Sequence, residues 1–177
     1  MIDNNAKEQE LCRNCGFCCD HTLFDIAGIK ADEILPEKFV GMECRKDDQR
    51  YFKLPCPYFD GVCTIYQEEK AHVCGSFRCK VLKDSTDGKI SFSDALEIIK
   101  DIKNKRDSLL ENYKTLTNDT VTFRELRWAS NALQTDSNLE EKKKDLFHKV
   151  QLLDFHLSQH FRSKESFDNN FEILDDD

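Results

Sequence analysis

Four thiols lie within eight residues in the segment Cys12-Arg13-Asn14-Cys15-Gly16-Phe17-Cys18-Cys19. A C-x2-C spacing brings two sulfurs to one metal, and the segment holds two overlapping copies, so Cys12, Cys15 and Cys18 can act together. Consecutive side chains diverge, so Cys18 and Cys19 do not easily bind one small ion in tetrahedral geometry. Either this pair serves two metals, or it reaches different atoms of one cluster, or one thiol is a spare.

The other five cysteines follow at wider spacings, and all nine stand before residue 80. Cys44 is isolated, and we favour a small buried apolar role for it. An odd number of thiols, and an N-terminus without a signal-peptide pattern, disfavour a disulfide framework. Eight thiols then form the candidate set, which could divide into two four-sulfur sites. The predicted metal ligands are Cys12, Cys15, Cys18, Cys19, Cys56, Cys63, Cys74 and Cys79.

Two kinds of metal centre fit these spacings. The triple run is similar to the cluster-binding run of bacterial ferredoxins, which adds a remote Cys-Pro ligand, here offered by Cys56-Pro57. An iron–sulfur cluster, with the [4Fe–4S] form first, is therefore the leading cofactor. Structural zinc sites more often use two separated C-x2-C knuckles, of which only the N-terminal one is present. Zinc stays the alternative.

A β-hairpin is predicted around Asp60-Gly61, which lies between aromatic and β-branched residues. If these two residues form the loop, Phe59 pairs with Val62. Cys56 and Cys63 then project from one face of the hairpin and present two thiols to the same side. Aromatic residues interleave with the cysteines throughout this region, so we expect a dry aromatic shell around the metal.

Composition indicates a soluble globular chain. Its 177 residues are 39% hydrophobic and 34% charged, with a formal net charge of −8. Residues before 80 include 10 basic and 14 acidic side chains, and the remainder 16 and 20. Neither half is basic, so no nucleic-acid partner is expected, and an acidic surface disfavours docking on an anionic membrane. No apolar run is long enough to span a membrane, and the expected compartment is the cytoplasm.

Composition changes sharply near residue 80, because all three prolines and five of the six glycines precede it. The predicted fold class is mostly α with a small irregular cysteine-rich α+β module. That metal-stapled module, residues 1–82, is expected to pack against about three C-terminal helices in a helical extension at 90–162, followed by an acidic tail at 163–177. Residues 1–10 are predicted as a loose lead-in, 83–89 as a turn or linker, and 50–54 as a short strand.

Capping signals predict the starts of the three helices. Ser93 is expected to cap a helix that runs to about residue 114. The pairs Thr122 with Glu125 and Ser137 with Glu140 have capping-box spacing and are expected to open the second and third helices. Each of these helices has one apolar face.

The histidines are weaker ligand candidates than the cysteines, and the sequence has no common catalytic motif. His21 and His72 stand near the cysteines, and either is an alternative ligand in place of a thiol. His156 and His160 have helical spacing that suits a shared zinc ion, but a solvated face is the favoured interpretation. The sequence has no phosphate-binding glycine loop, no G-x-S-x-G elbow and no H-E-x-x-H motif, so whether the chain is an enzyme is left open.

The ordered cysteine pattern resembles the CxxCxxCC cysteine-cluster family (YkgJ-like), described as zinc- or iron-chelating domains and related to the cysteine domain of flagellin lysine N-methylase. The resemblance covers about residues 12–79 and implies that the eight cysteines named above are metal ligands, with Cys44 outside the pattern. The sequence departs from the family at Lys70-Ala71-His72-Val73-Cys74-Gly75, where family members carry Arg-Pro before this cysteine and Arg after it. The resemblance is carried by Cys12-x2-Cys15-Gly16-x-Cys18-Cys19, Pro55-Cys56-Pro57-Tyr58, Gly61-x-Cys63-x-Ile65-Tyr66 and Cys74-x2-Phe77-x-Cys79.

Three functions are therefore considered. The first is an iron–sulfur protein for electron transfer or cluster carriage. The second is a structural zinc protein whose helical extension binds a protein partner. The third is an enzyme related to the flagellin methylase, which the absence of a recognisable nucleotide loop disfavours.

Overall fold

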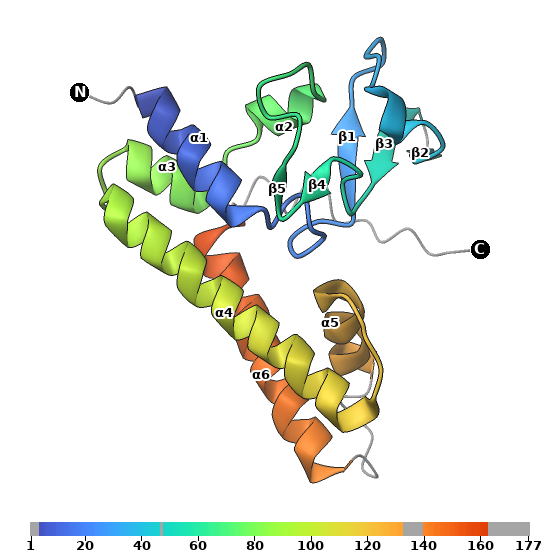
Figure 1. The fold of residues 1–177 in the computed structure, drawn as a ribbon, viewed down its shortest axis with the longest axis vertical. Coiled ribbons are helices and arrows are strands. Elements are labelled where there is room, and N and C mark those ends of the chain that lie inside the picture. Colours follow the sequence, from blue (N-terminus) through green and yellow to red (C-terminus); the bar gives the residue numbers. More distant parts are fainter. Residues whose placement is uncertain (1–3, 47, 133–139, 163–177) are drawn as a thin grey trace.

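The computed structural model describes residues 4–46, 48–132 and 140–162, and Figure 1 shows how their elements are arranged. This part of the chain is mainly helical with a small β component, as predicted, and three helices follow residue 90. The β component consists of two antiparallel sheets. The helices are α1 (Asn4–Cys15), α2 (His72–Ser76), α3 (Lys80–Thr86), α4 (Phe92–Thr117), α5 (Phe123–Ala132) and α6 (Glu141–His160), with a 3-10 helix η1 at Glu37–Phe39. The strands are β1 (Ile26–Ile29), β2 (Glu43–Lys46), β3 (Gln49–Lys53), β4 (Phe59–Asp60) and β5 (Val62–Cys63).

The larger sheet has three antiparallel strands in the order β1-β3-β2. Its central strand, β3, confirms the strand predicted at 50–54, one residue earlier at each end. Phe52 of this strand is buried and packs against Phe39 of η1, with ring centroids 4.5 Å apart. The cluster beneath the sheet is small, and its buried members are Ile29, Phe39, Phe52, Leu54 and Ala71.

The smaller sheet is the hairpin of β4 and β5, but its register differs from the prediction. Phe59 lies opposite Cys63, and Asp60 lies opposite Val62. The predicted pairing of Phe59 with Val62 is wrong because Gly61 alone makes the turn, at a φ of +69° that glycine adopts without steric cost. The shift places Cys63, rather than Val62, opposite Phe59 across the hairpin.

The helices share one large core with the first part of the cysteine region. In Figure 1, α4 and α6 lie side by side, α5 packs on both, and α1 and α3 pack near the start of α4. Buried residues of this core come from α1 and α3 as well as from the three later helices. The ring of Phe17, in the cysteine region, meets Phe161 at the end of α6 edge to face, with centroids 5.1 Å apart. The core therefore crosses the boundary predicted near residue 82.

The first long helix starts earlier than predicted. Ser91 caps α4, because its Oγ accepts from the backbone N–H of Asp94 at 3.0 Å while the Asp94 carboxylate accepts from the Ser91 N–H at 3.1 Å. The prediction of Ser93 as the cap is wrong. Ser91 has an acidic residue three positions later, which completes a capping box, whereas Ser93 has Leu96 there.

The predicted capping box of α5 is confirmed. The Glu125 carboxylate accepts from the Thr122 N–H at 2.7 Å, and the Glu125 N–H donates to the Thr122 Oγ1 at 3.3 Å. The predicted cap Ser137 and the acidic tail at 163–177 lie outside the described residues.

Two segments predicted to be irregular are helical. Residues 4–10 belong to α1, because Leu11 and Cys15 form a buried face of that helix and Glu8 forms an ion pair with Arg78. Residues 83–86 are the last turn of α3, which Val81 and Leu82 anchor in the core. Among the described residues, no helix is both long and apolar enough to cross a membrane.

Candidate metal centre

The first cysteine segment is a helix end followed by a tight turn. Cys12 and Cys15 occupy the last turn of α1, and Gly16 then adopts a φ of +73°. The Gly16 carbonyl accepts from the N–H of Cys19 at 2.8 Å, which closes the turn that carries Cys18 and Cys19. A Cβ at position 16 would lie 2.6 Å from the Phe59 ring, so both the backbone and the close approach require glycine.

The remote cysteines are placed at the edges of short elements. Cys56 donates its backbone N–H to the Cys19 carbonyl at 2.8 Å, which draws the second half of the cysteine region against the first. Cys63 ends β5, Cys74 lies within α2, and Cys79 immediately precedes α3. Each remote thiol therefore depends on a different local element for its position.

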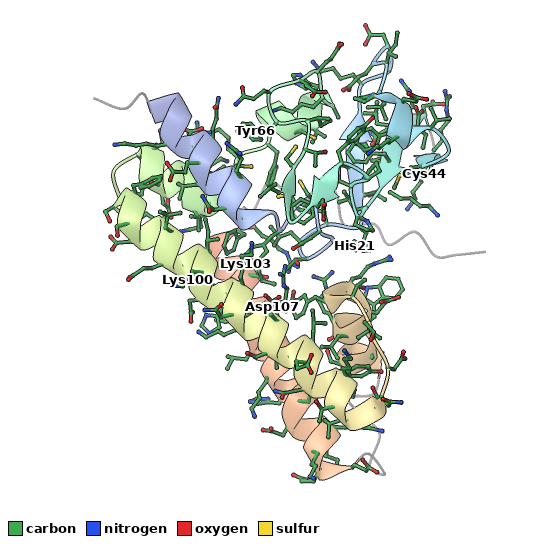
Figure 2. The ribbon with its side chains drawn as sticks, in the orientation of Figure 1. His21, Cys44, Tyr66, Lys100, Lys103 and Asp107 are labelled. Atoms are coloured by element: carbon green, nitrogen blue, oxygen red, sulfur yellow. The ribbon has the colours of Figure 1, made fainter. Side chains whose placement is uncertain are left out.

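Six thiols surround a cavity of about 120 Å³, which we call the outer cavity. Its remaining wall is mostly apolar and includes the rings of Phe24, Phe52, Phe59 and Phe77. Figure 2 shows sulfur atoms gathered between α1, α2 and β5. The cysteines of the outer cavity are Cys12, Cys18, Cys19, Cys56, Cys63 and Cys74.

A second cavity of about 40 Å³ adjoins the first, and we call it the inner cavity because residues of the helical core line it. Its far wall is formed by the helical core, with Ile99 of α4 and Phe161 at the end of α6. Three cysteines line both cavities. The cysteines of the inner cavity are Cys12, Cys15, Cys18, Cys19 and Cys79.

The structure thus brings all eight predicted ligands around two adjoining cavities. Cys44 lines neither cavity; it lies on β2, at the edge of the three-stranded sheet (Figure 2). The thiols surround a volume rather than a point, because no three His, Cys, Asp or Glu side chains among the described residues converge as ligands of one ion.

Burial raises the pKa of the clustered thiols. The pKa of Cys15 and of Cys18 lies well above the usual value, because burial disfavours the thiolate and neighbouring thiols add repulsion. Burial and the neighbouring thiols Cys56 and Cys63 raise the pKa of Cys74 to about 12. These thiols are therefore neutral by themselves, and a bound cation would supply the charge that favours their thiolate form.

The donors fit a soft metal. Within the described parts of the chain, neither cavity is lined by a carboxylate or an imidazole. Thiolate donors without oxygen ligands select zinc, copper(I) and iron–sulfur clusters over magnesium or calcium. The apolar wall would limit the access of solvent to a metal bound there.

Two cations stand at the edge of the outer cavity, beside Tyr66. Lys70 lies over the Tyr66 ring, with its Nζ 3.9 Å from the centroid, and donates to the Tyr66 carbonyl at 2.8 Å. The Arg13 guanidinium lies 5.7 Å from the same centroid. Burial raises the pKa of Tyr66 to about 12, and the neighbouring Cys12 and Cys63 add to the effect. Sequence reasoning missed both cations, although Arg13 stands inside the first cysteine run.

Helix α4 holds both ends of the first cysteine segment. Lys103 donates from its Nζ to the Asn14 carbonyl at 3.0 Å (Figure 2 labels Lys103). Arg106, one turn later, forms an ion pair with Asp20 and donates to the Thr22 Oγ1 at 2.9 Å. The sequence gives no local signal for these contacts, because 86 positions separate Arg106 from Asp20.

The histidines lie away from the thiols. His21 directs its Nε2 toward the Asp25 Oδ1 at 3.3 Å, and the exposed His72 lines neither cavity. His156 and His160 stack on α6 with ring centroids 6.4 Å apart. The described residues supply no third ligand that would complete a metal site with that pair.

No family model matches this chain, and comparisons with curated proteins and with solved structures give no significant match. The resemblance to the CxxCxxCC cysteine-cluster family therefore stays a prediction from the spacing of the cysteines. The case for the site rests on the placement of its thiols.

Proposed function

We propose that this chain is a cysteine-thiolate metal protein whose clustered thiols hold an iron–sulfur cluster for electron transfer or cluster carriage. One observation carries the proposal. Eight thiols from several separate stretches of the chain line two adjoining cavities, and Cys44, the cysteine predicted to stand apart, lines neither. Thiols gathered in this number with no disulfide among them fit metal ligation better than inert packing.

The shape of the site supports a cluster over a single ion. One zinc ion needs four sulfurs at about 2.3 Å from a single point. The thiols here instead surround the outer cavity of about 120 Å³, which suits ligands that reach separate irons of a polynuclear core. Such a cluster, [4Fe–4S] being the leading form, would accept or donate electrons when bound.

The protein's own residues would bind the cluster, keep water away and balance its charge. The thiolates bind, and the aromatic wall of the outer cavity excludes water. The positive charge of Lys70 opposes the rise that burial produces in the pKa of Cys12 and of Cys74. The exposed positions of these two cysteines leave the cluster accessible to an electron-transfer or acceptor partner. A reducing cytoplasmic compartment belongs to the proposal, because the thiols must stay reduced.

Structural zinc is the second candidate, and the small core beneath the three-stranded sheet favours it. A region with so few buried apolar residues is commonly held together by a metal. In that case the helical extension would bind a protein partner. The exposed apolar side chains Trp128, Leu152 and Phe155 on α5 and α6 are the surface that such a partner would meet.

Anaerobic purification tests the proposal, followed by an absorption spectrum and elemental analysis for iron, zinc and acid-labile sulfide. We expect brown protein with iron and sulfide in comparable amounts. Colourless protein with stoichiometric zinc would replace the cluster by structural zinc. A folded chain with free thiols and neither metal would overturn both candidates.

A matched pair of variants tests the ligand set. Cys15→Ser removes a thiol that lines the inner cavity and should lower the metal content, whereas Cys44→Ser should keep the full content. Equal losses in the two variants would show that the ligand set is chosen wrongly.

A further inference from the structure

Cys18 and Cys19 are adjacent in the chain but have different thiol neighbours. Cys18 packs against the helical core, whose buried members include Cys15 and Cys79. Cys19 instead accepts at its carbonyl from the N–H of Cys56, at 2.8 Å, and Cys56 packs against the cluster beneath the three-stranded sheet. The turn closed by Gly16 therefore directs the two side chains toward different groups of cysteines.

The walls of the two cavities divide the remaining thiols in the same way. Cys15 and Cys79 line the inner cavity but not the outer one. Cys56, Cys63 and Cys74 line the outer cavity but not the inner one. Together with Cys19, these three cysteines form an outer group of four thiols. Cys12 lies one helical turn before Cys15 on the same face of α1 and completes a second group of four.

The two groups also differ in depth. Cys15 and Cys79 are each 8% exposed, and the helical core closes the inner cavity through Ile99 and Phe161. Cys74 of the outer group is exposed and lies on a helix of only five residues. The inner group has one exposed member, Cys12, but residues of the helical core close its other side, whereas no residue of α4 or α6 lines the outer cavity. We therefore expect slower release of metal from the inner cavity than from the outer one.

We propose that the two cavities are two separate metal sites, a permanent inner site and an exchangeable outer site. The inner site joins the cysteine segment to the helices, and the outer site gives its metal to an external acceptor with thiol or chelating groups. This division rests on the proposed function, since both sites require that the chain binds metal. The inner ligands are Cys12, Cys15, Cys18 and Cys79. The outer ligands are Cys19, Cys56, Cys63 and Cys74.

Metal release from the full metal-loaded chain tests the division. Bathophenanthroline reports ferrous iron and 4-(2-pyridylazo)resorcinol reports zinc, each added in excess under anaerobic conditions. We expect two phases of equal amplitude, the faster from the outer site. Cys74→Ser should lose half of the metal and the fast phase, because Cys74 is exposed and lines only the outer cavity. Cys44→Ser should keep both phases.

A conservative pair on α4 tests the inner site without removing a ligand. Ile99→Val loosens the wall of the inner cavity and should accelerate only the slow phase. Ile102→Val removes the same methylene from an equally buried position of α4 that lines neither cavity, and it should leave both phases unchanged.

The outcomes separate this inference from the proposed function. Release in a single phase, with complete loss of metal in Cys74→Ser, would overturn the two-site division and leave the metal protein intact. Equal acceleration of both phases by Ile99→Val would also overturn it. A chain purified without any metal would overturn the proposed function, and the division with it.

Discussion

The helical part of the molecule and the segment between β1 and α2 are built on different amounts of buried apolar surface. The helices share a core in which Leu126, Val150 and Leu157 are fully buried, and this core extends to α1. The β1–α2 segment, residues 26–76, rests on one small cluster of buried side chains beneath a three-stranded sheet. Apolar burial is the main favourable contribution to folding, so the helices can fold by packing alone. The β1–α2 segment requires another source of stability. The thiols lie where this segment meets the helical part of the molecule.

The first cysteine segment contacts both the helical core and the β1–α2 segment. Phe17 packs against Phe161 of the helical core, whereas the Cys19 carbonyl accepts from the N–H of Cys56 in the β1–α2 segment. Metal at these cysteines would therefore connect a part that is stable by packing to a part that is not.

Metal removal should have the largest effect on stability, and it should destabilise the β1–α2 segment but not the helical core. Structural zinc typically contributes about 10–16 kcal/mol of binding free energy in small metal-dependent domains. We expect chelation to abolish amide-exchange protection in β1–β5 and to leave α4 and α6 protected. Hydrogen exchange followed by mass spectrometry, before and after chelation, measures both.

Either of two results would contradict this contrast. Unchanged protection in the β1–α2 segment after complete chelation would rule out a structural metal. Equal loss of protection in α4 and α6 would show that the helices do not fold by packing alone.

Truncation in the helical core should have the second largest effect and should spare the metal. Leu153 is 3% exposed on α6 and lines neither cavity, so Leu153→Ala should cost about 3 kcal/mol of unfolding free energy. Denaturant unfolding measures the cost, and elemental analysis should give an unchanged metal content. Metal loss that accompanies the stability loss would mean that the two parts are not independent.

Loss of the Arg106 side chain should weaken the contact between α4 and the end of the first cysteine segment. Arg106→Gln removes the ion pair with Asp20 and weakens the contact with Thr22, at a cost of about 2 kcal/mol. We expect faster metal release as well, because Asp20 directly follows Cys19. Lys105→Gln removes a surface pair with Asp101 on the same helix and should cost at most about 0.5 kcal/mol. Similar effects of the two variants on release would exclude a positioning role for Arg106.

Gly16→Ala should have the smallest effect on stability but should lower the metal content. The left-handed backbone alone costs about 1–2 kcal/mol, and the new Cβ forces the Phe59 ring to move. Gly41 has a similar φ of +84°, but open space surrounds it. Gly41→Ala should therefore lose stability through the backbone alone and keep the metal content unchanged. Equal metal contents in the two variants would show that the Phe59 contact does not shape the cavity.

The sequence predicts the helices after residue 90 and identifies the eight cysteines that the structure gathers around the two cavities, because both leave local patterns. The C-x2-C repeats mark the first cysteines, and Thr122 with Glu125 marks the start of α5. The cap of α4 could have been found by the same rule, since Asp94 stands three residues after Ser91.

What the sequence does not predict depends on contacts between distant segments. Residues 4–10 look polar and loose, yet they are helical because Leu11 and Cys15 share a face that packs on α4. The position of the loop residue Gly61 fixes the hairpin register, which the dipeptide Asp60-Gly61 leaves undetermined. The cations Lys103 and Arg106 reach the cysteine segment only because α4 lies beside it.

The central claim is that cysteine sulfur is the only protein ligand of the metal proposed for this chain. X-ray absorption spectroscopy at the edge of the purified metal tests it directly, because the fine structure reports the first ligand shell. The account predicts a shell of sulfur only, at about 2.3 Å for zinc or for the irons of a cluster. A first shell that contains nitrogen or oxygen at about 2.0–2.2 Å would contradict it.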